Sequence, residues 1–436
     1  MVRRSDRPLN EPALPAAPAG PAGRVRRLVT WLMEQPLPVP PERLRRGPFR
    51  EGAFGPRSTR LTSQLGLLLG VAFGVCFVTG LLSHLIQHPP GWFWWPSRPV
   101  WLYRATQGVH VATGLASIPL LGAKLWSVYP RLFTWPPART LLQAAERGGV
   151  AALVAGALFQ LTSGVFNIAR WYTPMPFFFT TGHYWVAWLT VGALLVHVSV
   201  QLPVVRDALG TRSEKRRTRL LDSPHPVRVG AEAGEADPGR RHVLLGAGIA
   251  AGLITVTTVG QTVRPLSRIA VLAPRRPTIG PQGLPVNKTA LGAGVRESAS
   301  DPAYTLTVTG PAGPVRLDLA ALNALPQYTV VLPIACVEGW SASGTWTGVR
   351  LRDLVEMVGA DPGRAHVLVE SLQAGGHYGS STVEPPLTAD SFTLIALRLR
   401  GEVLHLDHGY PARLIAPNRP GVLQTKWVGR LTVREA

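Results

Sequence analysis

Five long apolar stretches constrain the fold of this chain more than any other feature. They run over Leu61–Leu85, Trp101–Trp126, Gly149–Ile168, His183–Leu202 and His242–Val263. Each is long enough to cross the hydrocarbon core of a bilayer, which takes about 20 residues in an α-helix. One such stretch alone is equally compatible with a buried helix of a soluble protein. Five together, with tryptophan and tyrosine at several of their ends, predict a five-helix transmembrane bundle.

The basic residues indicate the orientation of this bundle. Twelve arginines precede the first stretch, and more follow the second and fourth, whereas the loops after the first and third hold only Arg98 and Arg170. Because Lys and Arg concentrate in cytoplasmic loops, we expect a multi-pass cell-membrane protein with a cytoplasmic amino terminus and an extracytoplasmic carboxy-terminal domain. These loops also explain the formal net charge of +20, so a nucleic acid partner is not expected.

Composition divides the chain into six segments: 1–60, 61–205, 206–241, 242–263, 264–300 and 301–436. The first and third are rich in arginine. We predict a disordered cytoplasmic tail, with a short amphipathic piece at Val25–Met33, and a basic cytoplasmic loop. The second and fourth segments hold the apolar helices, and the fifth is a linker rich in Pro and Gly.

The last segment has the pattern of a mixed α+β domain. Short β-branched runs alternate with turn residues, and one amphipathic helix is expected at Leu351–Val358. The predicted strands are Tyr304–Thr309, Tyr328–Ile334, His366–Ser371, Thr393–Leu399, Arg413–Ala416 and Leu431–Val433.

Cys336 has the strongest chemical signal in this domain. The only other cysteine, Cys76, lies in the first apolar stretch, so neither a disulfide nor a zinc site is expected. A free cysteine is most often a buried structural residue, and otherwise a nucleophile or a soft metal ligand. Its surroundings, Cys-Val-Glu-Gly-Trp-Ser over residues 336–341, resemble the molybdopterin-binding domain of the sulfite oxidase family, in particular its periplasmic methionine-sulfoxide reductase branch. The resemblance implies that the Cys336 thiolate ligates molybdenum.

Three further places resemble the same family and imply a binding site for the pterin. Asn287 stands where the reductase branch has a pterin-binding asparagine, and Arg413 stands on the strand that carries an arginine to the pterin phosphate. Lys426 belongs to a loop with a Lys-Trp pair that holds the pterin. His408 replaces the asparagine of that branch and can still donate a hydrogen bond. Taken singly, Arg413 and Lys426 are equally compatible with ordinary surface charges.

Glu338, His377 and Tyr378 are candidates for the walls of the molybdenum pocket. Glu338 lies two residues from Cys336, and His377 and Tyr378 lie in a glycine-rich loop, where they would serve as proton donors. Trp340 is as compatible with packing as with a role in the pocket. The domain leaves no room for the immunoglobulin-like dimerisation domain of animal and plant sulfite oxidases, so we expect a monomer.

Several histidines fall within the apolar stretches or at their ends, where ionisable residues are costly and usually functional. His183 and His197 are 14 residues apart, which places them on one helix face about 21 Å apart. Imidazole is a common axial ligand of haem iron. We therefore predict two b-type haems, and depth in the membrane predicts the ligand pairs His84–His183 and His110–His197. His88 is the alternative to His84, and packing roles are the alternative for all of them.

Residues 60–205 resemble the di-haem cytochrome b subunits of formate dehydrogenases and nickel–iron hydrogenases. The resemblance implies quinone or quinol as electron partner. Arg240 and Arg241, before the fifth stretch, resemble a twin-arginine export signal, which would carry a folded molybdenum domain across the membrane. Anchoring of the helix at the membrane surface is the alternative.

These features together predict a membrane-bound oxidoreductase with molybdopterin and haem b. The expected reaction is reduction of a sulfoxide-like small molecule or an oxidised protein by quinol. The alternative enzyme is a sulfite dehydrogenase, for which arginines near the metal would bind the anion; the candidates are Arg350, Arg352, Arg398 and Arg400. The alternative outside catalysis is an electron-transfer or sensor protein with a degenerate molybdenum domain.

Overall fold

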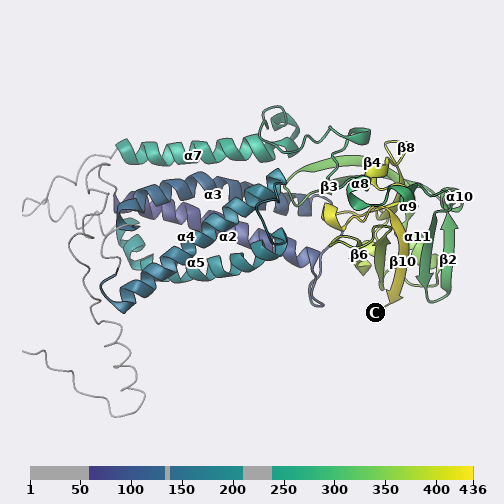
Figure 1. Ribbon diagram of the computed structural model, residues 1–436, viewed down its shortest axis with the longest axis horizontal. Coiled ribbons are helices and arrows are strands. Elements are labelled where there is room, and N and C mark those ends of the chain that lie inside the picture. The colour runs from purple at the N-terminus through teal and green to yellow at the C-terminus, as the bar shows by residue number, and fades with distance from the viewer. Residues whose placement is uncertain (1–57, 133–137, 210–237, 436) are drawn as a thin grey trace, which may run out of the picture.

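The computed structural model describes residues 58–132, 138–209 and 238–435. Two parts follow each other along its long axis, a bundle of long helices and a carboxy-terminal domain of short strands and helices (Figure 1). The predicted amphipathic piece at Val25–Met33, the tail up to residue 57 and the basic loop over residues 210–237 lie outside the described residues.

Five helices are long and apolar enough to cross a membrane, as the sequence predicts. Their bounds are α2 Thr59–Gln87, α3 Leu102–Leu132, α4 Leu141–Ala169, α5 Phe179–Leu209 and α7 Pro238–Val259. Large apolar side chains on their outer faces are exposed, among them Leu68, Val196 and Leu253. Such exposure is unfavourable in water and suits a surface that faces lipid. Helices α2 to α5 pack together, and α7 lies along α3 (Figure 1).

The carboxy-terminal domain is built from two sheets. The first has the strand order β2-β1-β10-β5-β6, with bounds Gly313–Asp318, Thr305–Gly310, Val428–Glu435, Ala365–Ser371 and Ser380–Val383. The second has the order β3-β4-β7-β8, with bounds Tyr328–Ala335, Ser341–Arg350, Leu394–Leu399 and Glu402–Val403, and β9 (Arg413–Ile415) pairs with β7. Neighbouring strands are antiparallel except β1 and β10, which are parallel.

The core of this domain joins strands of both sheets with helix α11 (Leu351–Met357). Leu306, Leu354 and Leu414 have no exposed surface, and burial of each contributes about 1.5–3 kcal/mol. The six predicted strands and the predicted helix are present with small shifts at their ends, and the α+β fold class is confirmed. Strands β2, β4 and β6 and the short strand β8 were not predicted.

The second half of the predicted linker is part of the domain. Short helices α8 (Ala290–Ala293) and α9 (Arg296–Ser300) follow residue 280, and Ala290, Val295 and Ala299 pack with Trp427. The domain therefore begins well before residue 301, and its position relative to the helices does not depend on a long flexible tether.

Direct contacts fix the domain on the end of the helical bundle (Figure 1). Asn418 is central: its side-chain oxygen accepts a hydrogen bond from the backbone N–H of Tyr103 at 2.6 Å, and its amide donates to the Pro96 carbonyl at 2.6 Å. Trp95 Nε1 donates to the Asn418 carbonyl at 2.8 Å. Since Asn418 and Tyr103 are both buried, these bonds hold the domain in one orientation over the bundle.

Candidate active site and the histidine cavity

Cys336 lies in the tight turn between β3 and β4, at the face of the domain that meets the helices. The Cys336 N–H donates to the Trp340 carbonyl at 2.9 Å, and the Gly339 N–H donates to the Cys336 carbonyl at 3.0 Å. Gly339 has φ of 88°, and a Cβ added there would lie 2.9 Å from the side chain of Val111 on α3. Only glycine permits both this conformation and this close approach to the helix.

The thiol of Cys336 is buried and contacts one of the predicted residues directly. Asn287 Nδ2 donates to Cys336 Sγ at 2.9 Å. Burial raises the pKa of Cys336, and the Glu338 carboxylate raises it further, whereas the Asn287 amide and the more distant Arg170 oppose the shift. A bound metal cation would replace the thiol proton, because a coordinating thiol is deprotonated by the charge of the metal.

His408, Arg413 and Lys426, predicted to hold the pterin, form one cluster in which His408 and Arg413 are buried and Lys426 is partly buried. Arg413 Nη1 donates to the His408 carbonyl at 3.1 Å, and Lys426 Nζ donates to the Asp407 carbonyl at 2.7 Å and the Lys288 carbonyl at 2.9 Å. Burial lowers the pKa of Arg413 to about 9 and the pKa of His408 to about 4. It also lowers the pKa of Lys426. The bond to Lys288 connects the cluster to the segment that carries Asn287.

The donors in this region fit an anionic cofactor. Arg413 Nε is a buried donor without a hydrogen-bond partner in the described structure. Asn287 Oδ1 and His408 Nδ1 are buried acceptors without one, since His408 Nε2 donates to the Pro281 carbonyl at 2.7 Å. Within the same part of the chain, neither Arg413 nor Lys426 forms an ion pair with an acidic side chain. Buried cations and unpaired donors are costly, and a phosphate group satisfies both. A ligand with a soft metal at Cys336 and a phosphate at Arg413 therefore fits these residues.

Glu338 is held on both carboxylate oxygens. Its Oε2 accepts from Trp340 Nε1 at 3.0 Å, and its Oε1 lies 3.6 Å from Arg170 Nε. Burial raises the pKa of Glu338, and the Trp340 and Arg170 contacts oppose the shift. Arg170 belongs to the helical bundle and was not predicted as a site residue. Its Nη2 also donates to the Asn287 carbonyl at 2.6 Å.

The two predicted proton donors have different environments. Tyr378 is partly buried, and burial and the charge of Cys336 raise the pKa of its phenol. His377 is exposed and stacks on Phe178, which belongs to the connection between α4 and α5, with ring centres 3.8 Å apart. Tyr172 of the same connection has a pKa raised to about 12 by burial and by the Glu338 carboxylate. The structure thus places Tyr378 near Cys336 and Tyr172 near Glu338. The Tyr172 hydroxyl itself donates to Asn167 Oδ1 of α4 at 3.0 Å.

Three of the four arginines proposed as an anion-binding cluster are engaged in other contacts. Arg350 covers the ring of Tyr328 at 3.4 Å, Arg352 pairs with Asp353 and Glu356, and Arg400 donates to the Gly283 carbonyl at 3.4 Å; none of these bonds involves Cys336 or its turn.

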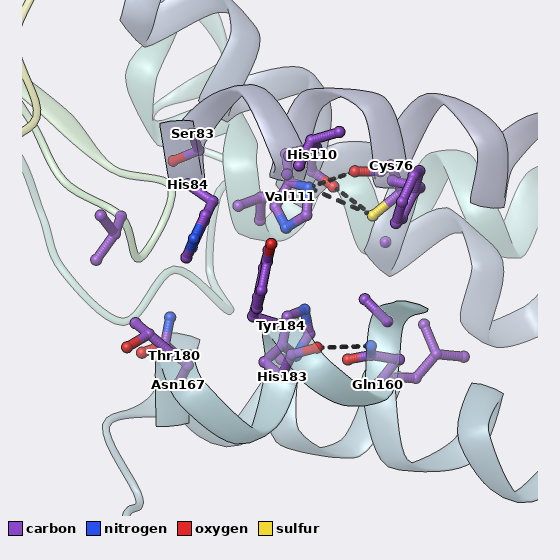
Figure 2. Close-up of a pocket in the computed structure, with 18 of the residues that line it drawn as sticks. Cys76, Ser83, His84, His110, Val111, Gln160, Asn167, Thr180, His183 and Tyr184 are labelled. Atoms are coloured by element: carbon purple, nitrogen blue, oxygen red, sulfur yellow. Dashed lines mark hydrogen bonds between the residues drawn. The ribbon is translucent and has the colours of Figure 1, made fainter. Parts of the chain in front are cut away.

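A cavity lies between α2, α3, α4 and α5 (Figure 2), and Val337 of the Cys336 turn is among its lining residues. Its walls include His84, His88, His110 and His183. The rings of His110 and His183 are 6.3 Å apart between centres and nearly perpendicular. His110 Nδ1 lies 2.8 Å from the Cys76 carbonyl oxygen, and His183 Nδ1 lies 3.0 Å from Ser163 Oγ. With Nδ1 engaged in this way, Nε2 of each ring is the nitrogen that remains for a ligand.

The histidines that meet are not the predicted pairs. His110 faces His183, whereas His84 stacks on Tyr184 with ring centres 3.8 Å apart, and His197 is not among the residues that line the cavity. The reason is the start of α5. The sequence pattern places His183 at the beginning of its helix, but α5 begins at Phe179. His183 therefore lies one turn inside the helix, where it meets His110.

The cavity and the Cys336 turn share a wall. Val337, the neighbour of Cys336, lines the cavity, and its carbonyl accepts a hydrogen bond from Gln107 Nε2 at 2.8 Å. Gln107 lines the same cavity and precedes His110 by one turn of α3. This contact joins residues 230 positions apart, so sequence spacing gives no indication of it.

Comparison with known proteins agrees with this geometry. Residues 293–436 match the family model of the oxidoreductase molybdopterin binding domain. Sulfite oxidase of Arabidopsis thaliana is 28% identical over 163 residues, covering 30% of this chain and 42% of that protein. Human mitochondrial sulfite oxidase is 28% identical over 158 residues, covering 30% of this chain and 29% of that protein. YedZ1 of Azospira oryzae, provisionally named a protein-methionine-sulfoxide reductase subunit, is 34% identical over 115 residues, covering 26% of this chain and 42% of that protein.

The matched region spans less than half the length of each of these relatives. Among solved structures, the sulfane dehydrogenase SoxCD from Paracoccus pantotrophus matches with a TM-score of 0.32 at 24% identity, covering 36% of this chain and 44% of that one, a likeness too weak to support a functional conclusion. The carboxy-terminal part of the chain is a molybdopterin-binding oxidoreductase domain. This domain belongs to the sulfite oxidase family, as its motifs predict.

Proposed function

We propose that this protein is a membrane-bound molybdenum oxidoreductase in which a b-type haem in the helical bundle passes electrons from quinol to the molybdenum domain. The observation that carries the proposal is the wall shared by the two sites. Val337 follows the predicted molybdenum ligand Cys336, lines the histidine cavity, and is bonded to Gln107, one turn from His110. Electrons would therefore cross between two adjoining sites of one chain.

The histidine cavity supports one haem, held by His110 and His183. Ligating imidazoles usually donate their other N–H to a backbone or side-chain acceptor, as the Nδ1 atoms of both rings can do here. Two imidazoles with metal–nitrogen bonds of about 2 Å have ring centres roughly 6 Å apart, and these rings are 6.3 Å apart. The predicted second haem has less support, because no histidine of the described residues contacts His197.

The protein would contribute ligands, orientation and charge to the molybdenum site. A bound molybdenum cofactor would supply two-electron exchange of an oxygen atom with the substrate. Cys336 would hold the metal, Asn287 would orient the Cys336 sulfur, and Arg413, Lys426 and His408 would bind the pterin phosphate. Tyr378 would be the hydroxyl donor near Cys336, since the Tyr172 hydroxyl donates to Asn167 Oδ1 at 3.0 Å.

The proposed reaction is the reduction of a sulfoxide to a sulfide. The sulfoxide S=O bond breaks, the sulfur gains two electrons, and the oxygen leaves as water with two protons. Oxidation of one quinol to quinone releases two electrons and two protons, so the reaction balances. The Cys-Val-Glu-Gly-Trp-Ser string and the provisional name of the Azospira oryzae relative support this direction.

The orientation follows from the distribution of basic residues. Arg98 and Arg170, the basic residues of the two loops with little positive charge, contact the molybdenum domain. The arginine-rich segments follow the opposite helix ends, and Arg240 and Arg241 begin α7 there. We therefore propose an extracytoplasmic molybdenum domain, reached with the help of the twin-arginine sequence.

Metal analysis and a reduced-minus-oxidised spectrum of the detergent-purified chain test the proposal. We expect about one molybdenum and one b-type haem per chain, and reoxidation of the haem by substrate. Cys336→Ser should abolish that reoxidation while the haem stays bound. His110→Ala and His183→Ala should each remove the haem, whereas His197→Ala is the control that keeps it. A chain without haem, or one that needs His197 and not His110, would contradict the assignment.

Sulfite oxidation with quinone as the electron acceptor is the second candidate, favoured by the sulfite oxidase relatives. It predicts haem reduction on addition of sulfite to the oxidised protein, whereas sulfoxide reduction predicts haem oxidation on addition of substrate to the reduced protein.

A further inference from the structure

The helical bundle supplies one wall of the Cys336 pocket. The connection between α4 and α5, residues 170–178, carries Arg170 and Phe178 to the molybdenum domain. Arg170 contacts Asn287 and Glu338, close to Cys336, and Phe178 stacks on His377 in the loop of Tyr378. The pocket is therefore complete only when both parts of the chain are present, and the bundle can influence which substrate enters.

Arg170 is fixed at the end of α4. It is the residue that ends the helix, its φ is 56°, and its N–H donates to the Asn167 carbonyl at 3.1 Å. From this position Nη2 donates to the Asn287 carbonyl and Nε approaches Glu338. The guanidinium thus bridges the residue that contacts the Cys336 sulfur and the carboxylate two positions beyond it. About a third of the Arg170 side chain is exposed, at 35%, and its contacts to Asn287 and Glu338 are made through Nη2 and Nε, which leaves Nη1 outside them.

Arg170 and Glu338 together carry almost no net charge. Glu338 is 5% exposed in its side chain, and Arg170 is the cation that pairs with it among the described residues. An oxyanion at this position would gain the attraction of Arg170 but would meet the buried carboxylate at nearly the same distance. An uncharged substrate with an S=O or N–O oxygen would accept a hydrogen bond from Arg170 without that repulsion.

We propose that Arg170 is a specificity-determining residue for the molybdenum site, which binds the oxygen of an uncharged S-oxide or N-oxide while its pairing with Glu338 disfavours oxyanions. The inference rests on the proposed sulfoxide reduction and adds the charge class of the substrate. It also assigns a residue of the membrane part to substrate recognition. Specificity here is a difference between two affinities, so the repulsive carboxylate matters as much as the attractive guanidinium.

The test uses the full chain loaded with cofactor and two probes. Dimethyl sulfoxide serves as the uncharged substrate, and sulfate serves as an oxyanion that does not react. We expect Arg170→Gln to raise the KM for dimethyl sulfoxide at least tenfold with a much smaller change in kcat. Glu338→Gln should lower the Kd for sulfate, measured by calorimetry, at least tenfold, and the double variant should return it to the weak binding of the parent.

Arg98→Gln is the matched control, because Arg98 also carries a positive charge from a helix connection to the domain but pairs with Asp390 instead. It should leave both the KM and the sulfate affinity unchanged. Arg170→Lys keeps the charge and provides a second variant if Glu338→Gln fails to load molybdenum. It should keep sulfate binding weak and raise the KM less than Arg170→Gln does.

Two outcomes overturn the inference: an unchanged KM in Arg170→Gln, or unchanged sulfate affinity in both Glu338→Gln and the double variant. Sulfate binding does not depend on turnover, so it separates this inference from the proposed function. If the parent turns over sulfite and not dimethyl sulfoxide, the proposed function fails, and tighter sulfate binding by Glu338→Gln would still establish the charge balance of the wall.

Discussion

Gln107 on α3 donates a hydrogen bond of 2.8 Å to the carbonyl of Val337, the residue after Cys336. Gln107 is 5% exposed, so this bond is made away from water. Gly339 approaches Val111 on the same helix, one turn further along. Helix α3 therefore holds the Cys336 turn through one polar and one apolar contact, and it also carries His110. A single rigid element connects the two candidate cofactor sites.

Replacing Gln107 with leucine should loosen this connection. The partly buried Val337 carbonyl would lose its partner, which costs about 1–3 kcal/mol and corresponds to a roughly 5- to 160-fold increase in opening of the turn. We expect faster hydrogen exchange of the amides at residues 336–341 and slower haem reoxidation by substrate, with molybdenum and haem still bound. Gln87→Leu is the control, because Gln87 bonds to Ser83 of its own helix. Equal effects of both changes would argue against the role of Gln107.

Gly80 on α2 should prove necessary for haem binding. A Cβ at residue 80 would lie 2.7 Å from Cε1 of His110, closer than side chains pack, so the His110 ring would have to move. Gly80→Ala is therefore expected to lower the haem content at least tenfold. Gly70→Ala on the same helix is the control, since nothing lies within 4 Å of a Cβ there. Both changes gain about 1 kcal/mol of helix propensity, so pyridine haemochrome content, and not thermal stability, is the quantity to compare.

The membrane helices and the family of the domain were predictable because both depend on local sequence. Apolar stretches of sufficient length predict the helices, and the motif around Cys336 predicts the molybdopterin domain. The pairing of the histidines was not predictable, because it depends on the residue at which α5 begins. Four residues precede His183 in the helix, and this shift of one turn places it opposite His110 of α3 instead of the predicted His84 of α2.

Strand β4 and the role of Arg170 were missed for different physical reasons. Strand β4 begins within the cysteine motif and contains Gly344 and Gly348, and glycine is depleted in strands. At Gly348 a Cβ would collide with the backbone of Ile395 on β7, so the residue that weakens the prediction is the one that permits the pairing. The contact between Arg170 and Glu338 joins two distant parts of the chain, and no periodicity in the sequence predicts it.

Arg413 should have opposite effects on stability with and without the cofactor. The residue is 3% exposed, and burial lowers the pKa of its guanidinium to about 9. Arg413→Met removes a buried charge, so the cofactor-free chain should gain roughly 1–3 kcal/mol. The loaded chain should instead lose stability and release molybdopterin on dilution, because the phosphate loses its partner. Thermal unfolding tests whether the substitution stabilises the cofactor-free chain and destabilises the loaded chain. Destabilisation of the cofactor-free form would contradict a site built for an anion.

The attachment of the domain to the bundle should weaken in acid at the Arg98–Asp390 contact. Arg98 makes two hydrogen bonds of 3.1 Å to the Asp390 carboxylate and covers the ring of Phe392, whose N–H also donates to Asp390. Burial raises the pKa of Asp390, but these bonds outweigh it and leave the pKa below its ordinary value. A carboxylate with a lowered pKa contributes stability above the pKa of its free form, about 4, and loses it as the pH falls further.

Hydrogen exchange of the connection between α2 and α3, measured from pH 6 to pH 3 and corrected for the intrinsic rate, checks this expectation. Protection at residues 96–103 should be constant above about pH 4 and should fall below it. Arg98→Gln should show lower protection at every pH, with a smaller dependence on pH. Because 48% of the Arg98 side chain is exposed, the change should be modest, and the Asn418 bonds should keep the domain attached. Complete release of the domain at pH 3 would show that the ion pair, and not Asn418, determines the docked position.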